Sequence, residues 1–251
     1  MSHGRRPASC LSALVASIAL FAAASPTFAQ DLGGALDLGQ LGADIGVNRA
    51  IRSQLSRPGP TRPGPSPRDT AGSTGATMAR LTYTPSMALR RRNLAQFVAA
   101  SRRRDPEGAA RLEATLASRD LIGEINRRMV GYGFRQNDVA DAYAAWWLNA
   151  WLASRGRTDD ATPRQISAVR VQAAAALSAL PPMRTATDAV KQEVAEAYLL
   201  QTALIGSHLE RSAGDPVQMR RVSAAVREGA RAAGLDLAGM ELTDTGFVLA
   251  R

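Results

Sequence analysis

The densest set of side chains that could do chemistry lies between residues 137 and 152. Two carboxylates, Asp138 and Asp141, stand three residues apart. A carboxylate pair at this spacing could supply a general acid and base or bind a metal ion. An aromatic wall, which could hold a sugar or an apolar ligand, follows them with all three tryptophans of the chain. One hypothesis is therefore a small-ligand-binding or hydrolytic site built from Asp138, Asp141, Tyr143, Trp147 and Trp151.

Helical geometry favours a second interpretation of the same segment. At about 100° per residue, the aromatic side chains, Trp146 included, fall within an arc of about 140°, and both aspartates point to the opposite side. Asp138 and Asp141 also occupy the first turn and a half of the expected helix, where the helix dipole favours anions whatever the function. We therefore expect a central aromatic helix with dipole-compensating acids, and we assign no catalytic residue.

Other catalytic and metal-binding patterns are absent from the sequence. His208 is the only histidine beyond residue 3, and neither Gly-x-Ser-x-Gly nor His-Glu-x-x-His occurs. We expect His208 to be a half-buried structural residue. The single cysteine, Cys10, lies in the N-terminal segment that we expect to be removed, which excludes disulfides and thiolate chemistry afterwards. We expect neither a metal site nor a cofactor.

A second candidate surface is a run of arginines. The net charge is +9, and residues 81–104 hold six arginines and no acid. Arg90, Arg91 and Arg92 lie near the start of the expected helix, where the dipole disfavours cations. Contact with an anionic lipid, lipopolysaccharide or an acidic partner would account for them, and a solvated arginine face is the alternative. The remaining charges nearly cancel, so no nucleic-acid partner is expected.

The first 80 residues predict export and a flexible connection. Arg5 and Arg6 precede an apolar run over residues 11–24 and a small-x-small pattern that ends at Ala29, which is typical of a secretory signal peptide over residues 1–29. This run is too short for a membrane-spanning helix, and no later stretch reaches the roughly 18 apolar residues that such a helix requires. Residues 30–80 are rich in glycine and proline and predict a disordered linker, with a docking peptide as the alternative. We expect a periplasmic or secreted protein.

From residue 81 onward, apolar residues recur every three or four positions, which predicts an all-α domain over residues 81–251. Helix starts are marked by Asp105-Pro106, Thr162-Pro163 and Asp215-Pro216. The tail from residue 235 is expected to be irregular or extended. The prediction is a helical bundle of about six helices, over residues 86–104, 106–130 (with a bend near 118–120), 137–155, 163–180, 187–213 and 216–234.

Two stretches carry a resemblance to a known family: Leu81-Thr82-Tyr83-Thr84-Pro85-Ser86 and Asn137-Asp138-Val139-Ala140-Asp141-Ala142-Tyr143-Ala144-Ala145-Trp146-Trp147. Over residues 81–249 the chain resembles an uncharacterised family of exported bacterial proteins defined by a domain of unknown function. The resemblance implies a helical protein of the envelope or the exterior and carries over no catalytic residue. The resulting expectation is an exported, non-enzymatic binding or interaction module whose partner is an unknown protein or an anionic envelope component.

We predict that the exported protein begins at Gln30, because signal peptidase accepts small residues such as Thr27 and Ala29 before the cleaved bond. N-terminal sequencing of the protein recovered from the envelope or the medium measures this directly. The substitution Ala29→Tyr should block cleavage and leave the leader attached. Recovery of the wild-type protein with Met1 intact would contradict the prediction.

Overall fold

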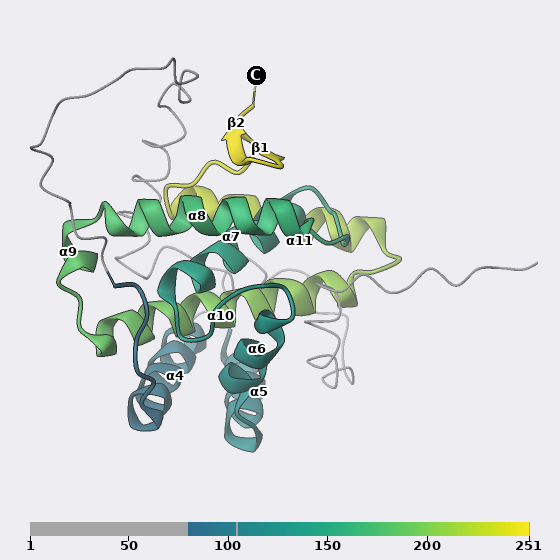
Figure 1. Ribbon diagram of the computed structural model, residues 1–251. Coiled ribbons are helices and arrows are strands. Elements are labelled where there is room, and N and C mark those ends of the chain that lie inside the picture. The colour runs from purple at the N-terminus through teal and green to yellow at the C-terminus, as the bar shows by residue number, and fades with distance from the viewer. Residues whose placement is uncertain (1–79, 104, 251) are drawn as a thin grey trace, which may run out of the picture.

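The computed structural model describes residues 80–103 and 105–250. The predicted signal peptide and, except for Arg80, the predicted linker lie outside these residues. The described part is all-α, as expected, with one small sheet (Figure 1). Its elements are α4 (Met87–Arg102), α5 (Pro106–Ser118), α6 (Leu121–Val130), α7 (Val139–Ser154), α8 (Pro163–Ser178), α9 (Pro181–Arg184), α10 (Asp188–Arg211), α11 (Pro216–Ala232), β1 (Met240–Thr243) and β2 (Gly246–Leu249). None of the described helices has the combined length and apolar character that crossing a membrane requires.

Side-chain caps begin the helices at the predicted places. Asp105 accepts a hydrogen bond from the backbone N–H of Gly108 at the start of α5, and Asp215 caps α11 in the same way. Thr162 and Gln165 form a reciprocal capping box at the start of α8. These starts were predictable because the capping residue and the proline that follows it act within one turn.

The expected helix over residues 106–130 is wrong as a single element, because the bend near residues 118–120 is a complete break. Arg119 adopts an extended backbone conformation with φ of −157°. The Asp120 carboxylate accepts a hydrogen bond from the N–H of Gly123 and begins α6 as a new helix. A side chain that binds the local backbone in this way competes with continuation of the preceding helix.

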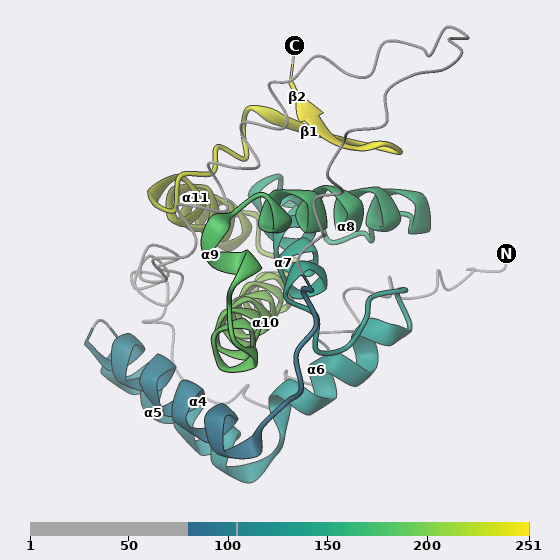
Figure 2. The same cartoon turned by 60° about the vertical axis from the view of Figure 1, so that its left-hand side comes forward.

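Two helices form the centre of the domain. All 16 residues of α7 are buried, and α10 is buried over most of its length. α8 and α11 pack against α7, while α4 and α6 pack against α10, so that the central pair is covered from both sides (Figures 1 and 2). The aromatic face of α7 packs into this core: the ring of Tyr143 meets that of Tyr198 edge-on at 4.9 Å between centroids, and Trp146 lies 5.3 Å from Tyr198.

The C-terminal tail, expected to be irregular or extended, forms an antiparallel hairpin of β1 and β2. Phe247 on β2 is buried and stacks on Trp147 with ring centroids 4.3 Å apart. Side chains from the helices bind both strands: the Gln172 amide exchanges two hydrogen bonds of 2.8 Å with the backbone of Phe247, and the indole of Trp151 donates to the carbonyl of Met240. These contacts occupy backbone groups through which a small sheet could pair with another chain.

Gly246 is required at the start of β2. Its φ is +104°, a conformation that L side chains rarely adopt. A Cβ atom at this position would also lie 2.3 Å from Oε1 of Gln172. The close approach of backbone and amide therefore depends on the absence of a side chain.

We predict that Gln172→Leu lowers the free energy of unfolding by about 1–3 kcal/mol, because the N–H and carbonyl of Phe247 lose their partners. Urea denaturation of the exported protein measures the change. Val171→Ala is the matched control, since this neighbouring side chain is 67% exposed and should change stability by less than about 0.5 kcal/mol. Equal effects of the two substitutions would contradict the assigned role of Gln172.

Candidate functional site

The structure places both candidate carboxylates in the interior, at the start of α7. Asp138 and Asp141 are only 2% and 0% exposed. The loop before them carries a left-handed residue, Asn137 with φ of 53°, which directs the chain into the helix. Oδ1 of Asp138 accepts hydrogen bonds from the N–H groups of Ala140 and Asp141 at 2.9 and 3.2 Å. Asp138 is therefore the N-cap of α7.

Two arginines neutralise the aspartate pair. Nη2 of Arg135 lies 3.0 Å from Oδ2 of Asp138, and Nη2 of Arg170, on α8, lies 2.7 Å from Oδ2 of Asp141. The backbone N–H of Arg135 also donates to Asp141. With two carboxylates and two guanidinium groups, this cluster is balanced in charge. It fastens the loop, α7 and α8 together.

The aspartates and the aromatic residues do not form one site. Tyr143, Trp147 and Trp151 are all buried, and each packs on other rings: Tyr143 on Tyr198, and both tryptophans on Phe247. The partners of the two aspartates among the described residues are backbone N–H groups and arginines rather than tryptophans. The set predicted for ligand binding therefore divides into a capping cluster and a packed core.

The environment of Asp138 nevertheless changes its acidity. Burial, and next the charge of Asp141, raise the pKa of the Asp138 carboxyl above its ordinary value, although hydrogen bonds and Arg135 act in the opposite direction. A raised pKa is typical of a general acid. Here, however, both oxygens of Asp138 already bind groups of the chain itself. The Asp138 carboxylate therefore caps the start of α7.

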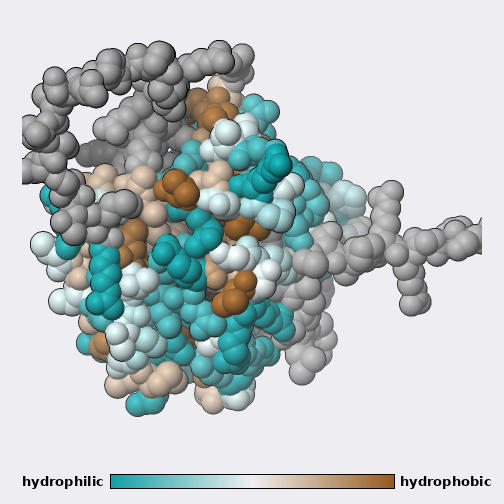
Figure 3. All heavy atoms as spheres, in the orientation of Figure 1, coloured by the Kyte–Doolittle hydropathy of each residue, from teal (hydrophilic) through white to brown (hydrophobic). Residues whose placement is uncertain are grey.

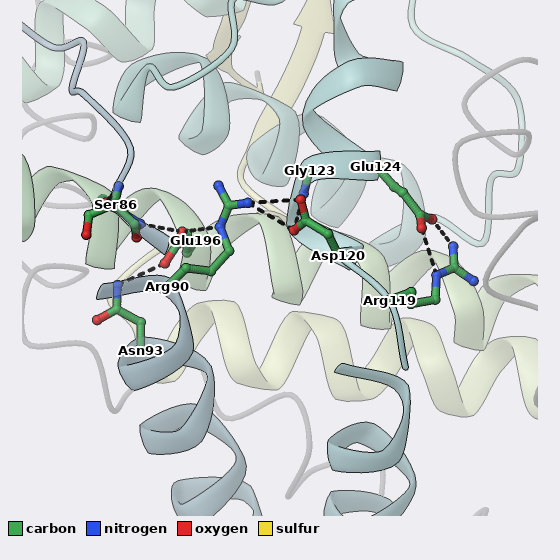
Figure 4. Close-up of polar contacts among 9 residues, drawn as sticks. Ser86, Arg90, Asn93, Arg119, Asp120, Gly123, Glu124 and Glu196 are labelled. Atoms are coloured by element: carbon green, nitrogen blue, oxygen red, sulfur yellow. Dashed lines mark hydrogen bonds and ion pairs between the residues drawn. The ribbon is translucent and has the colours of Figure 1, made fainter. Parts of the chain in front are cut away.

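Arg90 is buried, unlike the other two arginines of its cluster. It is 6% exposed, while Arg91 and Arg92 are exposed. Nε of Arg90 donates to Oε1 of Glu196 on α10 at 2.9 Å, and Nη1 donates to Oδ1 of Asp120 at 2.9 Å (Figure 4). The expectation that all three arginines share one contact surface therefore needs correction, because Arg90 is committed to two carboxylates of its own chain.

Further polar groups surround the Glu196 carboxylate. Asn93 donates to Oε2 and Gln192 to Oε1, each at 2.8 Å, and the Gln192 amide also exchanges two hydrogen bonds with the backbone of Ser86. These residues come from the start of α4, the start of α6 and the first half of α10. We call this set the Arg90 network: Ser86, Arg90, Asn93, Asp120, Gln192 and Glu196.

Two buried oxygens, Oη of Tyr83 and Oδ1 of Asn93, have no hydrogen-bond partner among the described residues. Asn93 belongs to the Arg90 network, and Tyr83 lies three residues before its first member, Ser86. Burial, followed by the negative charge of Glu196, raises the pKa of Tyr83, so its hydroxyl stays protonated. Sequence reasoning missed Asp120 and Glu196 as partners of Arg90, because they lie 30 and 106 residues away along the chain. No local pattern points to either one.

His208 is half-buried, as expected, and its Nδ1 lies 3.0 Å from Nη2 of Arg211. Burial, with a smaller contribution from Arg211, lowers the pKa of His208 to about 3. The imidazole is therefore neutral at physiological pH. Across residues 80–103 and 105–250, no three His, Cys, Asp or Glu side chains gather in a way that could hold a metal ion.

A family model matches residues 47–250, which include every described helix and both strands. The chain therefore belongs to DUF6683, a family of unknown function. The resemblance over residues 81–249 to an uncharacterised domain is confirmed, and DUF6683 begins further toward the N-terminus than that resemblance did. No curated protein and no solved structure matches the chain. Membership of DUF6683 thus indicates no substrate or partner.

We predict that Asp138→Asn gains stability relative to the wild type as the pH rises above the ordinary pKa of an aspartate, about 4. The raised pKa means that the folded protein binds a proton at Asp138 more readily than the unfolded chain does. This contribution to stability is therefore present at low pH and lost as the pH rises through the folded-state pKa. Asparagine keeps the helix cap and removes the titration. Urea denaturation at several pH values measures the difference.

Asp159→Asn is the control with the opposite sign. The hydrogen bond from Arg157 lowers the pKa of Asp159, so this carboxylate contributes stability above its ordinary pKa and loses it as the pH falls. The free energy of unfolding of the Asp159→Asn variant should therefore fall relative to that of the wild type as the pH rises. Parallel pH profiles for the two variants would show that the assigned environment of Asp138 is incorrect.

Proposed function

We propose that this protein is an exported, non-enzymatic module that binds an anionic lipid surface of the bacterial envelope through α4. The proposal rests on the outward face of α4, a helix without a carboxylate. Arg91, Arg92 and Arg102 are exposed on the helix, and Arg103 is exposed at its C-cap. Export is supported by the leader-like sequence of residues 1–29. The candidate acids Asp138 and Asp141 support an enzyme less well, because both are bound by arginines of the same chain.

The arginines form two parallel rows along the helix. At about 100° per residue, Arg91 and Arg102 lie on one line, and Arg92 and Arg103 lie on a second line about 100° away. Between the rows, the helix exposes only short side chains, including Ala95 and Ala99. Arg102 also pairs with Glu113 of α5, but both side chains are about half exposed, and such pairs contribute little.

A lipid surface fits this face better than a folded protein partner does. Protein interfaces depend on large apolar or aromatic anchors in their centre, and the centre of this face is formed by alanines. In the view of Figure 3, hydrophilic residues dominate and hydrophobic ones appear as separate patches. A diffuse negative surface potential requires no such anchor, and it attracts each nearby arginine by about 1 kcal/mol.

We predict that the exported form sediments with vesicles of phosphatidylglycerol and phosphatidylcholine, and that it stays in solution with phosphatidylcholine alone. The Arg91→Ala/Arg92→Ala variant should bind about 30-fold more weakly, because two arginines contribute about 2 kcal/mol and about 1.4 kcal/mol corresponds to a factor of ten. Binding should vanish at about 1 M salt, where the Debye length is about 3 Å.

Arg220→Ala/Arg221→Ala is the matched control. These two arginines are adjacent and exposed on α11, so the variant has the same net charge without a change in α4. It should bind the vesicles like the wild type. If both variants lost the same amount of vesicle binding, the binding would depend on net charge and not on the position of the arginines in α4. Binding that survives high salt would rule out an electrostatic contact through α4.

A further inference from the structure

We infer that α4 and α5 open away from α10 as a unit, with hinges at residues 84–86 and 119–120, while the central helices stay folded. The two helices follow one another in the sequence and pack side by side (Figures 1 and 2). The start of α4 and the end of α5 connect to the body through single extended stretches, before Met87 and after Ser118. We call α4 and α5 together the arm.

The arm buries few apolar side chains. The buried residues of α4 are Arg90, Asn93 and Val98, and those of α5 are Ala109 and Thr115. By contrast, every residue of α7 is buried. Since most of the stability of a helix in a protein comes from apolar packing, the arm has a much smaller share of that stabilisation than the centre has. Elements with few buried apolar contacts open at the lowest free energy.

Polar contacts hold the arm at its base. Within the Arg90 network, Arg90 connects the first turn of α4 to α10 through Glu196, and to the start of α6 through Asp120 (Figure 4). Asp120 lies two residues beyond the end of α5, so contacts from both hinges of the arm meet at the guanidinium of Arg90. The Asp120 side chain is 41% exposed, and water therefore reaches the network at that end.

The closed state, in which the Arg90 network holds the arm against α10 and α6, is only modestly favoured over the open state. Removing charged groups from water has a cost that offsets much of the attraction between them, and that cost is regained when an opening arm returns Arg90 and Glu196 to water. Tyr83 and Asn93 each keep a buried oxygen without a hydrogen-bond partner among the described residues, which further disfavours closure. Opposing this, Leu94, Phe97 and Leu116 pack partly against the core and keep the open form a minor state.

An opening arm would give the protein a movable charged element on a stable base. The exposed arginines Arg91 and Arg92 are on α4, so their direction would change with the arm while α7, α8 and α11 kept their packing. Opening of the arm depends on its own contacts with α10 and α6 and does not require α4 to bind lipid.

Native-state hydrogen exchange of the exported protein tests this inference without vesicles. Helices of 16 and 13 residues are marginal in isolation, so a detached arm exposes its amides to exchange. Amides of residues 91–102 and 110–118 should exchange at least about tenfold faster than those of residues 143–154 in α7. Equal protection of the arm and α7, with exchange only through global unfolding, would overturn the inference.

Asp120→Asn tests the network itself. Asparagine keeps the cap of α6 and removes the ion pair with Arg90, which should speed exchange in the arm roughly twofold to fivefold and leave α7 unchanged. Asp215→Asn is the matched control, because Asp215 caps α11 through Val217 and Gln218 and lies away from the arm. It should not alter exchange in the arm.

Glu196→Gln provides a second, stronger variant. It preserves the shape of the side chain and removes the buried carboxylate, and it should speed exchange in the arm by roughly tenfold or more. A rise confined to the arm supports the inference. An equal rise in the arm and in α7 would show that the network stabilises the whole domain cooperatively and would overturn the hinge.

Discussion

The position of the outer helices depends on one buried guanidinium. A charge in the interior must be paired and hydrogen-bonded, and Arg90 meets this requirement through Glu196 of α10 and Asp120 at the start of α6. These two contacts determine where α4 meets α10. Because Asp120 also caps α6, the same contacts coincide with the break between α5 and α6. The charge of Arg90 is paired because α4, α6 and α10 meet at its guanidinium. The arm connects to the rest of the domain at this point.

The second feature on which the fold depends is the complete burial of α7. Because this helix is buried, its acidic residues bind groups of the chain itself and stabilise the fold. Asp138 begins the helix, and Asp141 connects it to the preceding loop and to α8 through Arg135 and Arg170. The tryptophans pack on Tyr198 and Phe247 from distant parts of the chain. Both aspartates and the tryptophans of α7 are therefore buried in the interior, and the proposed function rests on the exposed arginines of α4 instead.

Much of the fold could be predicted because helix starts are local. Asp105, Thr162 and Asp215 each act within one turn of their helix, so the residues themselves indicate the boundary. The break at Asp120 was harder to predict, because the pattern of apolar residues continues through it. For the candidate site, helical geometry separated the aspartates from the tryptophans. It could not show that the opposite side of α7 is buried too, since that depends on which elements cover it.

By itself the sequence determined the helical class, most helix starts and the concentration of positive charge in α4, because these follow from residue type, capping and periodicity. Only the tertiary structure decided the roles of individual charges. Arg90, Arg91 and Arg92 are identical in type and differ by about 100° of rotation around the helix. One of them faces Glu196 and is buried, while its two neighbours face outward. That difference arises from a residue 106 positions away, and no local pattern contains it.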